Sequence, residues 1–399
     1  MSALSRLDER VGLAAHLTYI SADNATLVLV HNGVPRRIID FMSCYGAVNF
    51  GHRNPRFEKC LSDGSDTVGV CYPPEAEQVA RWLCAKTGLG DEGRVLFQVG
   101  GSFAVSTAVS LALRRRPGKM LAVEGCFHGL GADTLALTSI QHNFALQYTQ
   151  LPMSLNLQVV TLAVGQLPDS WHDISCLLFE PVQGANGYVP LDVHWLRLLV
   201  SAAKSAGVTV IADEVQAGFY RHGYLSPSFT WGLDPDVYLY SKSLTNGMFP
   251  LSAVVYRHSI EPHERHAFLA HTFQTATLGY RAAHAVTTYL DEVPVHEMVS
   301  AIETELNAAA HRLRTAAFAD DIHVCGPSLS FRPRVVDARQ LAADALSSGL
   351  LVFVGGSDFG RIRVAPPVTI PIPQLREGLA ILFERIAGCA TVGPFVPAT

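Results

Sequence analysis

Short apolar runs alternate with helical stretches through the middle of this chain. The runs do not alternate between apolar and polar residues, so each expected strand is covered on both faces of its sheet. Helical stretches such as 193–206 lie between several of them. This order predicts an α/β domain built on a mostly parallel, seven-stranded sheet. The expected strands are 94–98, 120–123, 158–162, 176–179, 208–212, 237–240 and 252–256.

The two ends of the chain show a different pattern. Near the N-terminus, apolar runs at 27–30 and 37–41 flank Asn32-Gly33, a pair that favours a tight turn, and together they predict a β-hairpin. Past Tyr280, two long helical stretches precede short strands and a last helix, which is typical of an α+β domain. These elements are expected at 280–292, 296–318, 328–335, 350–354 and 361–364, and after Pro373.

Length and pattern together predict two domains. A chain of 399 residues is too long for one small core. We expect 46–278 to form a large domain around the sheet and 279–399 to form the smaller α+β domain. The N-terminal segment 1–45 is expected to add its hairpin to the smaller domain.

Composition excludes several classes of partner. The net charge of −5 leaves no electrostatic footprint for nucleic acid, and the run Arg114-Arg115-Arg116 lies at an expected helix end, where cations complement the dipole. No apolar stretch reaches membrane-spanning length, and Met1 to Val11 lacks the apolar core of a signal peptide. The eight cysteines form no CxxC pair, so we expect reduced thiols, no metal site and a cytoplasmic protein.

Lys242 lies where a charged ammonium is costly. It follows the expected strand 237–240, whereas the other four lysines lie on amphipathic stretches or beside turn residues. A lysine buried there must be paired or neutral, and the neutral amine is the form that makes Schiff bases. Asp213 ends the strand 208–212 and needs a cationic partner. A pyridinium would supply it, so the pair predicts a pyridoxal 5'-phosphate (PLP) site. The alternative is a buried ion pair with Arg221.

Two further groups of residues follow strand ends. Gly100-Gly101-Ser102 opens the expected helix 103–114, where backbone N–H groups and the helix dipole favour an anion such as phosphate. An ordinary glycine-rich turn is the alternative. Phe127 and His128 follow the strand 120–123, at an edge where ligands bind. Phe127 could stack on a pyridine ring or pack in the core, and His128 could equally be structural.

Ten segments of the chain follow one another in a specific order and spacing. They are Asp40-Phe41, 48–52 with Asn54-Pro55, 127–129, 180–184, 211–223, Pro235-Asp236, Ser241-Lys242, 250–253, 271–273 and 362–367. Together they resemble the signature of the class III aminotransferases, which include ornithine, diaminobutyrate and 4-aminobutyrate aminotransferases. The resemblance covers most of the chain and implies the PLP-dependent transferase fold of type I, as in aspartate aminotransferase.

The resemblance also implies roles for single residues. Lys242 would carry the cofactor through a Schiff base and move protons, while Asp213 would bind the pyridine nitrogen. The remaining positions would surround the cofactor and the substrate, in a homodimer whose subunits share their active sites. They are Gln216 at the phenolic oxygen, Phe127 stacked on the ring with His128 beside it, Glu180 behind it, Gly101, Ser102 and the neighbouring subunit's Thr272 at the phosphate, and Arg363 at a substrate carboxylate.

Three departures from the family pattern affect the expected substrate. Phe103 stands near the phosphate helix where relatives carry a glutamate, and 274–277 replaces a Gly-Gly-Asn-Pro stretch. Ala185 stands where relatives carry a glutamate that can mask the carboxylate-binding arginine. We therefore expect Arg363 to stay open to carboxylates. The alternative is that Arg363 pairs with a structural acid of the smaller domain.

These residues predict a PLP-dependent aminotransferase of the ω-amino type. It would move an amino group between an amino-acid donor such as glutamate and a keto acid or aldehyde, with no nucleic-acid or membrane partner. An aminomutase, racemase or decarboxylase on the same fold is the nearest alternative, because each needs Lys242 and Asp213. A non-catalytic relative is the other, and the presence of Lys242, Asp213, Gln216 and Arg363 argues against it.

Overall fold

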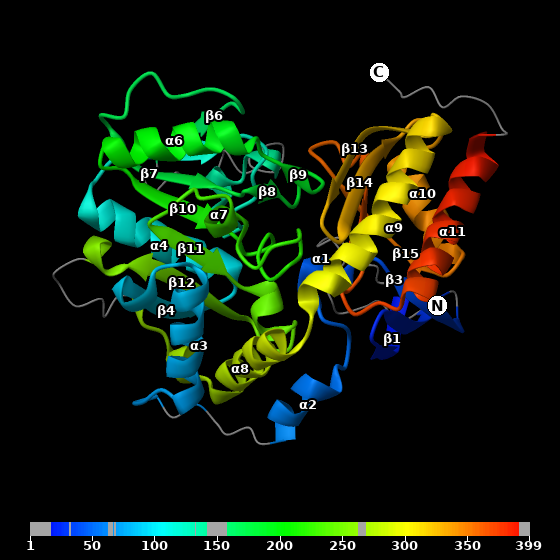
Figure 1. Ribbon diagram of the computed structural model, residues 1–399, viewed down its shortest axis with the longest axis horizontal. Helices are drawn as coiled ribbons and strands as arrows, with labels where there is room; N and C mark the ends of the chain where they lie inside the picture. Colours follow the sequence, from blue (N-terminus) through cyan, green and yellow to red (C-terminus); the bar gives the residue numbers. More distant parts are fainter. Residues whose placement is uncertain are drawn as a thin grey trace, which may run out of the picture.

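The computed structural model describes residues 17–31, 33–62, 67, 69–131, 133–141, 158–261 and 269–390. Two bodies lie side by side, a large sheet with its helices on the left of Figure 1 and smaller sheets with α9, α10 and α11 on the right. The N-terminal stretch, where no signal segment is expected, and the turn residue Asn32 lie outside the described residues.

The large body is built on a seven-stranded sheet in the order β4-β12-β11-β10-β7-β5-β6. The run from β11 to β6 is parallel throughout, and β12 alone is antiparallel to both of its neighbours. The expected seven-stranded, mostly parallel sheet is confirmed. Its strands are β4 (Gly93–Val99), β5 (Lys119–Val123), β6 (Val159–Leu162), β7 (Ile174–Phe179), β10 (Thr209–Asp213), β11 (Val237–Tyr240) and β12 (Leu251–Arg257).

Both faces of this sheet are covered, which explains the uninterrupted apolar runs. Leu177 and Phe179 of β7 join one core cluster, while Cys176 and Leu178 join the other. Successive side chains of a strand point to opposite faces, so a strand buried on both sides is apolar at every position. Helix α4 (Gly101–Arg115) covers one face, and the other packs against α3 (Pro74–Lys86), α6 (Val193–Ser205) and α8 (Thr277–Glu292).

The smaller body joins the two ends of the chain. Strands β1 (Leu17–Asp23), β2 (Thr26–His31) and β3 (Val34–Asp40) form an antiparallel meander, which confirms the expected hairpin and adds β1 to it. β3 then pairs in parallel with β15 (Leu350–Leu351), so N-terminal and C-terminal segments share one sheet.

A second, antiparallel sheet completes the smaller body. Its order is β13-β14-β17-β16, and three long helices pack around it and the first sheet. α8 packs instead against α2 (Pro55–Ser62) and α3 of the large body, and the domain boundaries at 45 and 278 stay predictions. The elements are β13 (Ala319–Cys325), β14 (Ser328–Pro333), β16 (Phe353–Gly355), β17 (Arg361–Val364), α9 (Val295–Thr315), α10 (Ala338–Ser347) and α11 (Ile372–Ala390).

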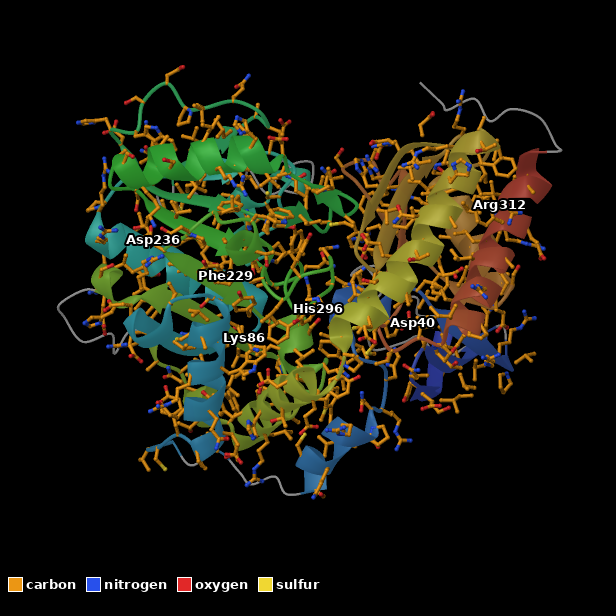
Figure 2. The ribbon with its side chains drawn as sticks, in the orientation of Figure 1. Asp40, Lys86, Phe229, Asp236, His296 and Arg312 are labelled. Atoms are coloured by element: carbon orange, nitrogen blue, oxygen red, sulfur yellow. The ribbon has the colours of Figure 1, made fainter. Side chains whose placement is uncertain are left out.

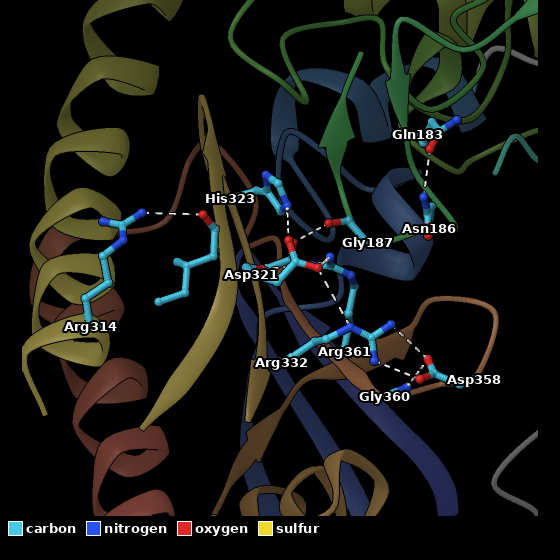
Figure 3. Close-up of polar contacts among 12 residues, drawn as sticks. Gln183, Asn186, Gly187, Arg314, Asp321, His323, Arg332, Asp358, Gly360 and Arg361 are labelled. Atoms are coloured by element: carbon cyan, nitrogen blue, oxygen red, sulfur yellow. Dashed lines mark hydrogen bonds and ion pairs between the residues drawn. The ribbon is translucent and has the colours of Figure 1, made fainter. Parts of the chain in front are cut away.

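A short β-hairpin and a contact between two aromatic side chains connect the two bodies. β8 (Val182–Gln183) and β9 (Val189–Pro190) form a hairpin whose tip reaches the small sheet, where the Ser330 hydroxyl donates to the Gly187 carbonyl. Beside it, Asp321 pairs with Arg361 (Figure 3). On the other side, His296 at the start of α9 (Figure 2) lies edge-on to Tyr220, with ring centroids 5.1 Å apart.

Arg221 is the most deeply buried of these connections. Its side chain is fully buried, and its guanidinium donates to the carbonyls of Ala365, Pro327 and Pro366 in the smaller body at 2.8–3.2 Å. Desolvation lowers the pKa of Arg221 to about 10. Arg221 therefore links the loop after β10 to the small sheet, and no bond between Arg221 and Asp213 is found among the described residues.

Arg221→Ala should lower the thermal unfolding midpoint by at least ~5 °C, because three buried carbonyls lose their charged donor. Differential scanning calorimetry measures this midpoint. Arg36→Ala is the matched control, since Arg36 also donates to a carbonyl but at an exposed site. A midpoint for Arg221→Ala as high as that of Arg36→Ala would contradict this account of the junction.

Candidate active site

A cavity of about 160 Å³ lies at the carboxyl ends of the parallel strands. Ligands of open α/β sheets bind at this edge, because the loops that follow the strands converge there. Eight of the residues predicted from the sequence line it, whereas Thr272 and Arg363 do not. The lining residues are Gly101, Ser102, Val105, Phe127, His128, Gly129, Glu180, Asp213, Val215, Gln216, Ser241 and Lys242.

One end of the cavity is the N-terminus of α4. Gly100 precedes the helix with φ of +80°, and among the described side chains none caps the helix. A Cβ added at Gly101 would lie 2.9 Å from a methyl group of Val215, so glycine is needed for this close approach. The first N–H groups of α4 and the Ser102 hydroxyl therefore form a site suited to an anion.

Asp213 is held at the end of β10 and is 4% exposed. Its Oδ2 lies 2.8 Å from Nδ1 of His128, and its Oδ1 accepts the Val215 N–H. The other ring nitrogen of His128 is buried without a partner among the described residues. His128 is thus the structural partner of Asp213, in the place for which Arg221 was the alternative.

Glu180 supports the site from the end of β7. Its two oxygens accept the N–H groups of Phe127 at 2.6 Å and Gly184 at 2.7 Å. Desolvation raises the pKa of Glu180 to about 7, Asp213 adds to the rise, and His128 and the two N–H groups oppose it. Glu180 therefore fixes the two loops that carry Phe127 and Gly184.

Lys242 follows β11 and begins a short 3-10 turn, Lys242–Thr245. Its φ of +43° is unfavourable for a residue with a side chain, and such strain is frequent at functional sites. Desolvation lowers the pKa of Lys242, and Arg363 lowers it further, while Glu180 and Asp213 oppose the shift. Desolvation and the charge of Arg363 thus both favour the neutral amine that a nucleophile requires.

Gln216 lies at the rim of the cavity, and its amide donates to the Tyr45 carbonyl at 2.7 Å. Tyr45 belongs to α1 (Ser43–Gly46), where Ser43, Cys44 and Tyr45 all have positive φ. Sequence reasoning did not single out this segment. Its three consecutive residues with side chains give no turn signal of the kind that glycine provides.

Arg363 lies on β17, outside the cavity lining, and is 5% exposed. Its two terminal nitrogens donate to the carbonyls of Gly184 and Val354, each at 2.9 Å. The expectation of an open arginine is therefore not met, because backbone carbonyls and neighbouring rings cover the group. Among the described residues no carboxylate lies within ion-pair distance of it, so the alternative of a structural acid is not met either.

Thr272 lies in a 3-10 turn, Thr272–Thr275, at the surface. Its neighbour Phe273 is 58% exposed, and Phe103 at the start of α4 is 42% exposed, with its ring edge-on to that of His271. These side chains do not reach the cavity of their own chain. A contribution of Thr272 to a site would have to come from a second copy.

The lining residues fit PLP. The glycine-opened helix end suits a phosphate, the buried Asp213 carboxylate suits a pyridinium, Phe127 offers a ring and Lys242 an amine. No cluster of three or more His, Cys, Asp or Glu side chains that could hold a metal ion occurs within the described ranges. Nor does any described helix have the length and apolarity to span a membrane.

Comparison with known proteins identifies a family that spans most of this chain. The model of the family "Aminotransferase class-III" matches residues 12–386. A probable 4-aminobutyrate aminotransferase of Bacillus subtilis is 27% identical over 87% of this chain and 88% of its own. A 5-aminovalerate aminotransferase of Pseudomonas putida is 26% identical over 93% of both, and the diaminobutyrate–2-oxoglutarate aminotransferase of Rhizobium meliloti is 25% identical over 88% of this chain and 85% of its own.

A solved structure gives the same result for the fold. A transaminase from the marine bacterium Virgibacillus superposes with a TM-score of 0.84 over 98% of both chains, at 19% identity. The expected type I fold is confirmed, and the mutase, racemase and decarboxylase alternatives are not favoured. With a family model that spans nearly the whole sequence, the chain belongs to the class III aminotransferases, a PLP-dependent family, and is a transaminase.

Proposed function

We propose that this transaminase moves an amino group between a carboxylate-bearing donor such as glutamate and a keto acid or aldehyde, as an ω-amino type enzyme. The observation that carries the proposal is that the buried Lys242 amine and the Asp213–His128 pair line one cavity. The names of the relatives add support, since they describe 4-aminobutyrate, 5-aminovalerate and diaminobutyrate aminotransferases.

PLP is the proposed cofactor, with its phosphate at Gly101 and Ser102 and its ring on Phe127. When bound, PLP supplies an electron sink for the electrons released at the substrate carbon. Asp213 would keep the pyridine nitrogen protonated through a charge-assisted hydrogen bond. His128 holds the Asp213 carboxylate in place from its other side, and Gln216 would donate to the phenolic oxygen.

Lys242 would move the proton in each half-reaction. Its Nζ atom takes a proton from the substrate carbon that bears the amine, which requires the unprotonated form. Burial of the amine lowers its pKa and so favours that form. Arg363 would bind a substrate carboxylate through its two terminal nitrogens, a contact that a planar guanidinium makes well.

We further propose a cytoplasmic homodimer with shared sites. Cys84, Cys126 and Cys176 are buried thiols outside any disulfide, as expected in a reducing compartment. The exposed Thr272 and Phe273 lie beyond the cavity of their own chain, and a second copy could use this surface. Thr272 of that copy would then complete the phosphate site.

Lys242→Ala should abolish turnover while the fold survives, because the covalent link and the proton transfer both depend on this amine. Steady-state transamination with a panel of amine donors measures the loss, and circular dichroism checks the fold. Lys86→Ala is the control, since Lys86 pairs with Asp291 at the surface. Near-native activity of Lys242→Ala without added amine would exclude the proposed role.

Asp213→Asn should reduce turnover by at least ~100-fold with the cofactor still bound, because the lost charge-assisted hydrogen bond is worth ~3 kcal/mol. Visible absorbance of the purified variant reports the bound cofactor independently of turnover. Asp234→Asn, at an exposed ion pair with Lys204, is the control. Turnover within a few-fold of the wild type would remove Asp213 from the proposed mechanism.

Mixing two inactive proteins tests the shared site. If subunits exchange at random, Lys242→Ala and Thr272→Asp protomers in equal amounts should recover about a quarter of wild-type activity, because half of the dimers then carry one intact site. A protein that carries both substitutions in every chain, without any wild-type chain, is the control and should stay inactive. Sedimentation equilibrium measures the assembly, and a fully active monomer would contradict the model.

A further inference from the structure

Two aromatic rings enclose the guanidinium of Arg363. Phe353 on β16 is the direct cross-strand partner of Arg363 on β17, so the two side chains share one face of the small sheet. The guanidinium carbon lies 4.4 Å from the centre of the Phe353 ring and 5.5 Å from that of Tyr188. Aromatic faces attract a cation without cancelling its charge.

The positive charge of Arg363 is therefore covered but not neutralised. Its terminal nitrogens donate to neutral carbonyls, and its Nε is buried without a partner among the described residues. A buried cation without a carboxylate partner keeps a strong tendency to bind one. A glutamate mask would compete with a substrate carboxylate for this charge, whereas a ring competes only by occupying space.

Gly355 and Ala185 allow the backbone beside Phe353 to lie close to the guanidinium of Arg363. A Cβ added at Gly355 would lie 2.7 Å from Nε of Arg363 and 3.1 Å from the Ala185 carbonyl, so this position needs glycine. The Ala185 carbonyl in turn accepts the Gly356 N–H at 2.9 Å. The loop that carries Ala185 is thus bound to the end of β16, the strand that carries Phe353.

The outer edge of the Phe353 ring meets Tyr45 at the surface. Their ring centroids are 4.7 Å apart at an interplanar angle of 86°, and Tyr45 is 38% exposed. Tyr45 is the last of three consecutive residues with side chains at φ of +48°, +49° and +58°. Such strain persists only where neighbours hold it, here through Gln216 on the Tyr45 carbonyl.

We propose that Phe353 and Tyr45 form an aromatic gate over Arg363 that determines substrate specificity. With the gate closed, the site presents apolar rings and accepts an amine whose group at that end is uncharged and apolar. With the gate open, Arg363 binds the carboxylate of the amino-acid partner. This inference rests on the proposed function and identifies the two substrate classes that one site would serve.

Phe353→Ala and Phe353→Leu test the gate, and Phe359→Leu is the matched control. Phe359 belongs to the same body, and its ring lies 5.0 Å from the guanidinium of Arg339 instead. Glutarate, a dicarboxylate without an amine, is titrated calorimetrically into each protein. Its affinity should rise about three- to ten-fold in Phe353→Ala, less in Phe353→Leu, and not in Phe359→Leu. Arg363→Met should weaken glutarate binding at least ~10-fold.

Turnover supplies the second measurement. The ratio of kcat/KM for glutamate to that for benzylamine should rise at least ~3-fold in Phe353→Ala and by less in Phe353→Leu, because the aromatic ring that covers the cation is removed. Unchanged glutarate affinity and an unchanged ratio in both folded variants would overturn the gate. If the wild type transfers no amino group, the proposed function fails, and the glutarate titrations still decide whether Phe353 covers Arg363.

Discussion

The parallel pairing of β10 with β11 is the constraint on which the site depends. Asp213 ends β10 and lies opposite Leu239 of β11, so the chain that leaves β11 reaches Lys242 at the same edge of the sheet. Parallel strands end together, and both strands are fully buried. The carboxylate and the amine therefore line the same cavity. Both groups are buried, and electrostatic interactions are stronger there than in water.

Charge balance around this edge explains the supporting residues. Desolvation favours the neutral form of Lys242 and also the protonated form of Glu180. Asp213 keeps His128 as a partner, which fixes the carboxylate without removing it from the cavity. The N–H groups that Glu180 accepts come from Phe127 and Gly184, so the acid also orders the loop that leads toward Arg363.

The junction between the two bodies positions Arg363, the proposed carboxylate-binding residue. Gly184 belongs to the large body, yet its carbonyl accepts from Arg363 of the small sheet. Arg221 crosses in the opposite direction to three carbonyls of the smaller body. Buried arginines therefore connect the bodies from both sides, and the orientation of Arg363 depends on the same contacts that hold the two bodies together.

The sequence by itself determined the sheet, the family and most of the predicted residues that line the cavity, because these depend on local patterns. Apolar runs mark buried strands, and Lys242, Asp213 and Gly101 each follow such a run. Only the tertiary structure decided the partner of Asp213, which is 85 residues away, and the cover of Arg363, whose carbonyl partner Gly184 is 179 residues away. Those contacts form when separate elements pack together, and no local pattern encodes the distance or the angle at which they meet.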